Sequence, residues 1–521
     1  MRKILISLAA LCCMTGCLDD KTNHDYSEIN AVEISNIGSS YTIFKGEELR
    51  ISPEVAFSME GVSPDVSYEW WFNMELYSEE KDFVYKGGEI GEHTLLFCVT
   101  DNATGVKYHY KDEGIRLVVQ TVYKYGFMVL SDDDGRSMLS MIKTKTVPTE
   151  SGDADSLVVV GANIDIFPTL GRGPVRLLEH GLMDDYAIEE VMVVQERTME
   201  LDGNSMQAEL YTDQEFSGSA PAGFRCVNAI LSGGSNYLLG ADGHVYYSIN
   251  AEGFYPHTGF YSPEPLHNGN KYTQLIQTNL TDNDFILAVE ESSNSLVGLV
   301  VAGYDNGYGL NLSNMYDGKL ARIVDDSSYD MTLFKDPDHK WERLYTTWYE
   351  GYGMVSILRE RATNKYYAHT FEFYMSGYRY SEVASLEIDG WDLRELDPEP
   401  FTDFRCMATF PFRYYGLVAS GKTLYRIGYR DWDEDTAAIK TFDSPIVQVA
   451  VKDHAYWSDE SVGGPLFAVA LENGEVHVFK MAGDDPADFE EVFRGGGFGK
   501  VVDLKFKWSN TIVSNWGLHV P

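Results

Sequence analysis

The feature that most constrains the fold of this chain is a hairpin-like unit that recurs from about residue 121 to the end. In each copy, an apolar strand leads through a tight turn, in several cases Asp-Gly or Asn-Gly, into a strand of alternating residues. The copies are Phe127 to Ile142, Val191 to Leu201, Tyr237 to Ile249, Phe285 to Val300, Met354 to His369, Leu417 to Ile427 and Phe467 to Phe479.

The spacing of these units is that of propeller blades. One residue of each apolar strand serves as a marker: Met128, Met192, Tyr237, Leu287, Met354, Leu417 and Phe467. Successive markers are 64, 45, 50, 67, 63 and 50 residues apart, and a four-stranded blade with its loops needs about 45 to 60 residues. We therefore predict an all-β chain with a β-propeller over residues 121–521. Seven blades fit best, with six or eight as alternatives; two stacked sandwiches would not give near-equivalent hairpins throughout.

Residues 31–120 show a different pattern and are predicted to form a separate β-sandwich. Short alternating strands are separated by turn residues, at Ile51 to Phe57, Ser67 to Phe72, His93 to Val99 and Ile115 to Val119. Four or more such strands in about ninety residues are typical of an Ig-like fold.

The strand that holds Trp70 and Trp71, followed by the segment from Gly91 to Asp101, resembles the PKD-like Ig-fold pattern. A tryptophan in such a sandwich fills the space between the two sheets, so core packing is favoured over ligand binding for this pair, although one of the two must face outward. On the later strand we expect Thr94, Leu96 and Cys98 to face inward.

The N-terminus has the pattern of a bacterial lipoprotein signal. Arg2 and Lys3 precede an apolar run from residue 4 to residue 14, and small Thr15 and Gly16 precede Cys17. We predict a signal peptide over residues 1–16, lipidation at Cys17 and a flexible tether over residues 17–30. Cys12 and Cys13 are rival lipid sites, and an ordinary signal peptide or a buried apolar strand are the alternatives. Acidic residues directly after Cys17 resemble the signal that sends lipoproteins of Bacteroidota to the outer face of the outer membrane.

Composition limits the partners of this chain. A formal net charge of -39, from 80 acidic and 41 basic residues, argues against nucleic acid, whose phosphates need a basic face. After the signal, no apolar run approaches about 20 residues, so the lipid is the expected membrane attachment. Cys98, Cys226 and Cys406 are far apart in sequence and are expected to be buried free thiols.

Together, the lipoprotein signal, one PKD-like domain and a C-terminal propeller resemble the PKD-like lipoproteins of Bacteroidota, which accompany Sus-type outer-membrane uptake systems. The segment from Phe127 to Gly135 is a second recognisable part of this resemblance. It implies nutrient capture at the cell surface, with a SusC- and SusD-like transporter complex as a partner. It implies no catalytic residue.

Aromatic residues are concentrated between residues 341 and 380, where they suit a surface that stacks on sugar rings or holds peptide side chains. For any one of them, core packing is still the more frequent role. Near glycines, and in a Gly- and Pro-rich loop, we expect exposed aromatic side chains, and these five are the candidate ligand-binding residues: Trp348, Tyr352, Tyr378, Tyr255 and Tyr261.

The remaining motifs favour structure over chemistry. Residues 131–138 resemble the Asp-box of sialidase propellers, a folding turn, with Met138 in place of the usual Trp. The acidic run over residues 431–435 lacks the glycine and glutamate of a calcium loop and is interpreted as a solvated loop. Zinc, nucleophile-elbow and phosphate-loop motifs are missing from the sequence. We therefore predict no catalytic residue, cofactor or metal ligand.

These observations favour a non-enzymatic outer-membrane lipoprotein that captures a glycan or oligopeptide or docks on a Sus-type transporter. Two alternatives stay open. A propeller-type glycoside hydrolase or lyase would need paired carboxylates in the central channel, and 80 acidic residues allow too many pairs to judge. A purely structural component would contact only other proteins.

Overall fold

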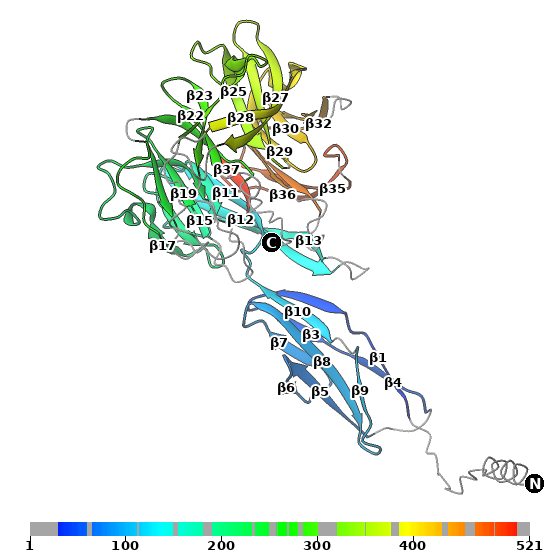
Figure 1. The fold of residues 1–521 in the computed structure, drawn as a ribbon. Helices are drawn as coiled ribbons and strands as arrows, with labels where there is room; N and C mark the ends of the chain where they lie inside the picture. The colour runs from blue at the N-terminus through cyan, green and yellow to red at the C-terminus, as the bar shows by residue number, and fades with distance from the viewer. Residues whose placement is uncertain are drawn as a thin grey trace, which may run out of the picture. The chain divides into compact units, whose positions relative to one another are not determined.

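The structure of this protein is a computed structural model (Figure 1), and it describes residues 30–59, 65–111, 114–148, 155–180, 190–231, 235–249, 257, 259–267, 270–279, 285–300, 320–349, 351–376, 385–429, 436–453, 464–483 and 485–507. In these ranges the regular structure is strand, apart from the short 3₁₀ helices η1 (Thr212–Gln214), η3 (Met331–Leu333) and η4 (Glu399–Phe401). None of the helices found there is long and apolar enough to cross a membrane. The protein is therefore all-β, as the strand patterns predicted.

The chain divides into two compact units, and the first holds most of the strands β1 to β10. Their bounds are β1 Val32–Ser35, β2 Ser40–Phe44, β3 Glu48–Ile51, β4 Glu54–Phe57, β5 Val66–Phe72, β6 Glu75–Ser78, β7 Phe83–Lys86, β8 Gly91–Asp101, β9 Lys107–His109 and β10 Ile115–Gln120. One sheet has the order β2-β10-β8-β5-β6, with β9 paired to β8, while β1 pairs with β4 and β3 with β7. This is the Ig-like sandwich that the sequence predicted.

Trp70 forms the centre of the sandwich core. Its ring lies on β5 and packs against Phe97 on β8 at 4.6 Å and against Phe83 on β7, in a different sheet, at 4.8 Å between centroids. The indole N–H donates to the carbonyl of Lys81 at 3.1 Å, so the buried polar atom is satisfied. Trp71 faces the other way, with Lys107 Nζ 5.4 Å from its ring. One tryptophan is therefore in the core and one is outside, as expected.

The predicted phase of β8 is wrong by one residue. Leu95, Phe97 and Val99 are fully buried and face the core, whereas Thr94 is exposed and Leu96 is half-buried. Because side chains alternate along a strand, the larger apolar set decides which face turns inward. Cys98 is also buried, although its side chain lies on the opposite face of the strand. In the sheet it pairs with Glu69 on β5 and with His109 on β9.

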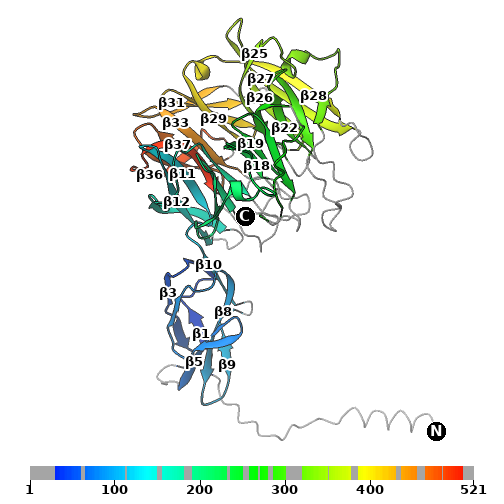
Figure 2. The same ribbon diagram turned by 90° about the vertical axis from the view of Figure 1, so that its left-hand side faces the viewer.

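The described strands of the second unit form six sheets, which make up the seven predicted blades (Figures 1 and 2). The fourth and fifth blades share one eight-stranded sheet, because β24 (Leu320–Ile323) pairs in parallel with β28 (Ser385–Leu396). Each blade has four strands, except the third, in which three are described. Blade 1 consists of β37 Lys500–Lys507, β11 Gly126–Asp133, β12 Arg136–Pro148 and β13 Asp155–Asn163, and blade 2 of β14 Arg176–His180, β15 Glu190–Val194, β16 Met199–Asp202 and β17 Ala208–Tyr211. Blade 3 consists of β18 Cys226–Leu231, β19 Ser235–Gly240 and β20 Val245–Ile249, blade 4 of β21 Tyr272–Ile276, β22 Phe285–Glu290, β23 Ser295–Val300 and β24 Leu320–Ile323, and blade 5 of β25 Trp341–Trp348, β26 Gly353–Glu360, β27 Lys365–Ser376 and β28 Ser385–Leu396. Blade 6 consists of β29 Phe404–Phe410, β30 Tyr415–Ser420, β31 Thr423–Gly428 and β32 Ala437–Thr441, and blade 7 of β33 Ile446–Lys452, β34 Leu466–Leu471, β35 Val476–Met481 and β36 Phe489–Gly495.

The last strand closes the ring. β37 pairs antiparallel with β11, so the first blade combines the start and the end of the propeller sequence (Figure 2). The first strands of neighbouring blades lie side by side, β37 beside β14, β14 beside β18, β18 beside β21, β29 beside β33 and β33 beside β37. These strands therefore line the inside of the ring. Phe127 and Phe506 pack edge to face across the closure at 5.0 Å.

Every marker residue of the repeated hairpins lies in the second strand of a blade: β11, β15, β19, β22, β26, β30 or β34. These strands lie between sheet neighbours and between blades, and nearly all their described residues are buried. A strand covered on both faces needs a continuous apolar run, and this is why the repeat is visible in the sequence. The predicted blade number of seven is confirmed.

A buried histidine in blade 5 makes stability depend on pH. The ring of His369 stacks on Phe371 at 4.8 Å and meets Phe334 edge-on at 4.9 Å, and in the described part of the chain neither ring nitrogen has a hydrogen-bond partner. Burial, aided by the charge of Arg343, lowers the pKa of His369 to about 3. Because the folded pKa lies below the unfolded value of about 6.5, the stability is complete above that value and is lost as the pH falls.

Between pH 7 and pH 5 this histidine alone is expected to cost about 2 kcal/mol of unfolding free energy. The variant His369→Phe keeps the aromatic packing and should lose that part of the pH dependence. Urea unfolding of both proteins at the two pH values tests this. Identical pH dependence in the variant and the parent would contradict the assignment.

Candidate functional site

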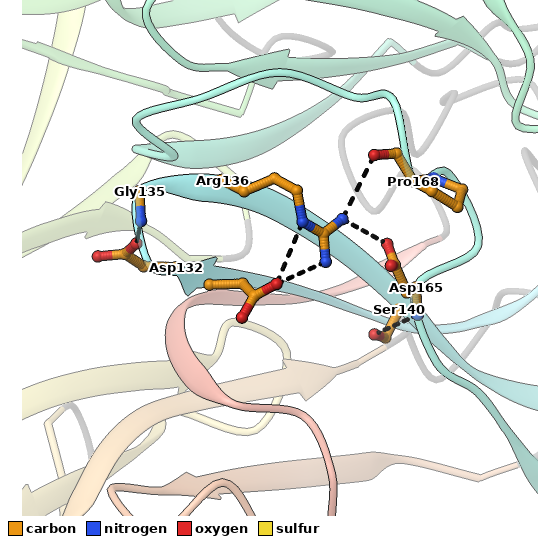
Figure 3. A network of polar contacts seen from close by, with 7 residues as sticks. Asp132, Gly135, Arg136, Ser140, Asp165 and Pro168 are labelled. Atoms are coloured by element: carbon orange, nitrogen blue, oxygen red, sulfur yellow. Dashed lines mark hydrogen bonds and ion pairs between the residues drawn. The ribbon is translucent and has the colours of Figure 1, made fainter.

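The Asp-box-like segment forms the turn between β11 and β12 (Figure 3). The Asp132 carboxylate accepts a hydrogen bond from the backbone N–H of Gly135 at 2.6 Å, and the φ of +82° at Gly135 is one that glycine adopts without strain. Arg136 donates to Asp133 at 2.7 Å and to Asp165 at 3.0 Å, which ties the hairpin to the segment leading to β14. These charges are engaged within the fold, so the segment serves folding, as expected.

Two of the five candidate binding residues are buried, and their expected exposure is wrong. Trp348 ends β25, and Phe412 from the next blade packs edge-on against it at 5.7 Å between ring centroids. Tyr261 packs against Phe216 at 5.5 Å, in the core between blades 2 and 3. In both cases a side chain from a distant part of the sequence covers the ring. Glycines and prolines nearby therefore did not indicate a surface position.

Tyr352 is exposed as expected, with 54% of its surface accessible. Tyr378 and Tyr255 lie outside the residues that the structure describes, as do Cys17 and the acidic run over residues 431–435. Of the remaining aromatics between 341 and 380, most are buried or half-buried in blade 5.

Tyr374 and Trp391 add two exposed aromatics to blade 5, at 46% and 37% accessibility. Tyr352 immediately precedes β26, whose first residue Gly353 pairs with Glu372 on β27. Tyr374 follows two residues later, so Tyr352 and Tyr374 lie at the same end of blade 5. Trp391 is on β28, next to β27 in the sheet. Trp391 pairs with Phe371, and its ring lies 6.3 Å from that of His369, so it belongs to the face opposite Tyr374. We call Tyr352 and Tyr374 the aromatic edge.

A second group of residues, which the sequence analysis did not predict, gathers in blade 2. Four glutamates surround one histidine: Glu190 on β15, Glu200 on β16, Glu209 on β17, Glu215 after η1 and His257 in the segment between β20 and β21. We call these five residues the carboxylate cluster. Glu190 and Glu200 are buried, whereas Glu209 and His257 are partly accessible.

Both ring nitrogens of His257 face carboxylates. Nδ1 lies 2.6 Å from Glu215 Oε1 and 4.0 Å from Glu200 Oε2, while Nε2 lies 3.3 Å from Glu209 Oε2 and 3.6 Å from Glu190 Oε2. The hydroxyl of Thr212 donates a short hydrogen bond to Glu200. The cluster therefore concentrates carboxylate oxygens around one imidazole inside the protein.

Burial and crowding shift the titration of this cluster. Burial, with the charge of Glu200 adding to it, raises the pKa of Glu190 well above its usual value. Burial also raises the pKa of Glu215 to about 7, although the hydrogen bond with His257 opposes it. Burial would lower the pKa of His257, but the hydrogen bond and the charges of Glu215, Glu200 and Glu209 outweigh it and raise this pKa to about 9. Such shifts are frequent at functional sites.

The sequence does contain a signal for this cluster. Glu190 directly precedes the apolar run from Val191 to Val194, and Glu200 lies between Met199 and Leu201. A glutamate facing the core of such a hairpin is unusual, since buried charges need a partner. The partner, His257, lies 57 residues after Glu200 in a segment without periodicity, so no local pattern joins the two.

Comparison with known proteins supports the N-terminal part of this description. Residues 17–163 match the model of the PKD-like family. The match extends past the sandwich to Asn163, the end of β13, and so includes β11 to β13 of the first blade. No curated protein matches the sequence.

Solved structures give distant likenesses. A quinonprotein alcohol dehydrogenase-like protein from Bacteroides thetaiotaomicron is 12% identical, with 90% of this chain and 96% of that chain covered and a TM-score of 0.27. Prp20p from Saccharomyces cerevisiae is 11% identical, covering 75% and 87%, with a TM-score of 0.34. The WD40 domain of SCAP from fission yeast is 11% identical, covering 74% and 90%, with a TM-score of 0.29. At these scores the likenesses say nothing of activity.

Proposed function

We propose that this protein is a lipid-anchored, non-enzymatic binding protein of the outer-membrane surface that captures a glycan or an oligopeptide. The observation that carries the proposal is the aromatic edge of blade 5, where Tyr352 and Tyr374 are exposed at the same end of one sheet. Aromatic rings present a large apolar face at small entropic cost and stack on sugar rings or peptide side chains.

Neighbouring groups hold the Tyr374 side chain and the backbone next to Tyr352. The Tyr374 hydroxyl donates a short hydrogen bond to Glu387 on the adjacent strand β28. Gly351, next to Tyr352, has a φ of +74°, and its carbonyl accepts a hydrogen bond from Asn279 of blade 4 at 3.2 Å. Residues fixed before binding lose less conformational freedom when a ligand arrives. The aromatic edge is thus suited to capture.

The lipoprotein signal and the family match of residues 17–163 support the proposed setting. In this proposal acyl chains on Cys17 hold the molecule at the membrane, with about 0.8 kcal/mol for each buried CH₂ group. The captured ligand would pass to a SusC- and SusD-like transporter complex, which is the partner that the sequence resemblance implies.

Binding and anchoring together test this function. Residues 18–521 are titrated with plant, host and microbial glycans and with short peptides by calorimetry. For the ligand that binds, Tyr352→Ala and Tyr374→Ala are each expected to weaken the affinity about 2- to 10-fold. Phe260→Ala is the matched control, because Phe260 is exposed but lies outside blade 5. In cells, Cys17→Ala should abolish acyl labelling and release the protein from membranes.

The outcomes separate the alternatives. Affinity unchanged in both tyrosine variants, or no binding across the panel, would overturn the capture proposal. Cleaved ligand detected by mass spectrometry would favour the hydrolase or lyase. Stable protein partners recovered from native membranes, without a small ligand, would favour the structural component.

A further inference from the structure

The carboxylate cluster has no role in capture at the aromatic edge, and its geometry points to a different function. We propose that Glu190, Glu200 and His257 bind a divalent transition-metal ion, with Zn²⁺ or Mn²⁺ as the best-matched ions. One ligand atom from each of these residues lies within 4.8 Å of the other two. The three residues come from β15, β16 and the segment after β20, so the ion would join blade 2 to the chain that follows blade 3.

The charge of the cluster is not balanced by protein groups. Four carboxylates face a single imidazole, and in the described ranges no lysine or arginine forms an ion pair with any of the four. Carboxylates that are withdrawn from water without a counter-charge are costly. A divalent cation would supply the missing positive charge at the place where the oxygens meet.

An unpartnered buried oxygen gives an independent indication. Glu190 is only 2% exposed, and among the described residues its Oε1 atom has no hydrogen-bond partner, while its Oε2 atom lies 3.6 Å from Nε2 of His257. Buried polar atoms in proteins almost always have a partner. Two ligands of one tetrahedral ion, each about 2.1 Å from it, would lie roughly 3.4 Å apart, close to that separation.

His257 is oriented as a metal-binding histidine usually is. Such a residue directs one ring nitrogen to the metal and donates the N–H of the other to a carboxylate. Here Nδ1 is hydrogen-bonded to Glu215 at 2.6 Å, which leaves Nε2 facing Glu190 and Glu209. Glu215 is then a positioning residue, and Glu209 can complete the ligand set.

The donor set selects the class of metal. Ca²⁺ and Mg²⁺ prefer oxygen ligands alone, whereas imidazole nitrogen together with carboxylate oxygen suits Zn²⁺ and other transition metals, and Mn²⁺ accepts the carboxylates. No thiolate is among the proposed ligands. The site should therefore bind Zn²⁺ or Mn²⁺ in preference to Ca²⁺ and Mg²⁺.

The experiment uses residues 18–521 purified without added metal or chelator. Plasma mass spectrometry is expected to find about one equivalent of a transition metal, and chelation should lower Tm. Adding Zn²⁺ or Mn²⁺ should restore Tm, whereas Ca²⁺ and Mg²⁺ should not. Glu190→Gln and His257→Gln are expected to weaken metal affinity at least ~10-fold. Glu196→Gln and His244→Gln are the controls, because they alter the same residue types outside the cluster.

The opposite result is equally clear. If the purified protein holds no metal, and neither Zn²⁺ nor Mn²⁺ changes Tm, the cluster is balanced by protons instead and the proposal fails. In that case Glu190→Gln, which removes a crowded carboxylate, should leave stability unchanged or raise it. If the variants fold poorly, the metal content and the ion-dependent Tm of the unmodified protein still decide the question. Ligand capture by the aromatic edge is measured separately and does not depend on this outcome.

Discussion

A chain that ends before Lys500 is expected to lose the closed propeller. β37 supplies the innermost strand of the first blade and pairs along nearly the whole of β11. Without it, β11 has an open edge, and the buried faces of the neighbouring strands β14 and β33 lose their cover. Size-exclusion chromatography and thermal unfolding of residues 18–499 should show an aggregating protein without a cooperative transition. A monomer that melts like the full chain would contradict closure by β37.

A single substitution in β37 tests closure of the ring without removing the strand. Phe506→Ala removes a buried ring that packs on Phe127, and we expect a loss of about 3 to 5 kcal/mol in unfolding free energy. Lys500→Ala is the matched control on the same strand. Lys500 is exposed, and its ion pair with Asp132 at 3.1 Å should contribute no more than about 1 kcal/mol. Urea unfolding measures both.

The second large effect is expected in the sandwich. Trp70→Ala removes a fully buried ring between Phe83 and Phe97 and leaves the carbonyl of Lys81 without its donor, so it should cost about 3 to 5 kcal/mol. Near-UV circular dichroism during urea unfolding follows the loss of this aromatic core.

Trp71→Ala is the control, because it removes the neighbouring ring from the other face of β5. Trp71 is only partly buried, and its contacts are a hydrogen bond to Glu69 at 2.8 Å and the charge of Lys107. We expect a loss of about 1 kcal/mol or less. If both variants lose equal stability, the assignment of Trp70 to the core and Trp71 to the outside is wrong.

The blades were predictable because their second strands are apolar on both faces, and burial of this kind leaves a continuous signal in the sequence. Which face of β8 turns toward the core was not predictable, since both of its faces carry apolar residues. Phe97 and Val99 face the core that Trp70 occupies, and Cys98 is buried on the opposite face.

Exposure of single aromatics could not be predicted from local sequence. Phe412 covers Trp348 from 64 positions away, and Phe216 covers Tyr261 from 45 positions away. The carboxylate cluster could not be predicted for the same reason, since His257 comes from outside the hairpin that holds Glu190 and Glu200. Contacts between blades depend on how whole sheets pack. The residue pattern of one strand does not show which side chains of the next blade will cover it.

The pairing of the first and last propeller strands has a kinetic consequence. Phe127 and Phe506 touch although they lie 379 positions apart, so the contact can form only when nearly the entire chain is present. Proteins dominated by such distant contacts fold slowly, on the scale of about milliseconds to seconds or longer. The ring can therefore close only after the last strand has been synthesised, and until then β11 presents an unpaired edge.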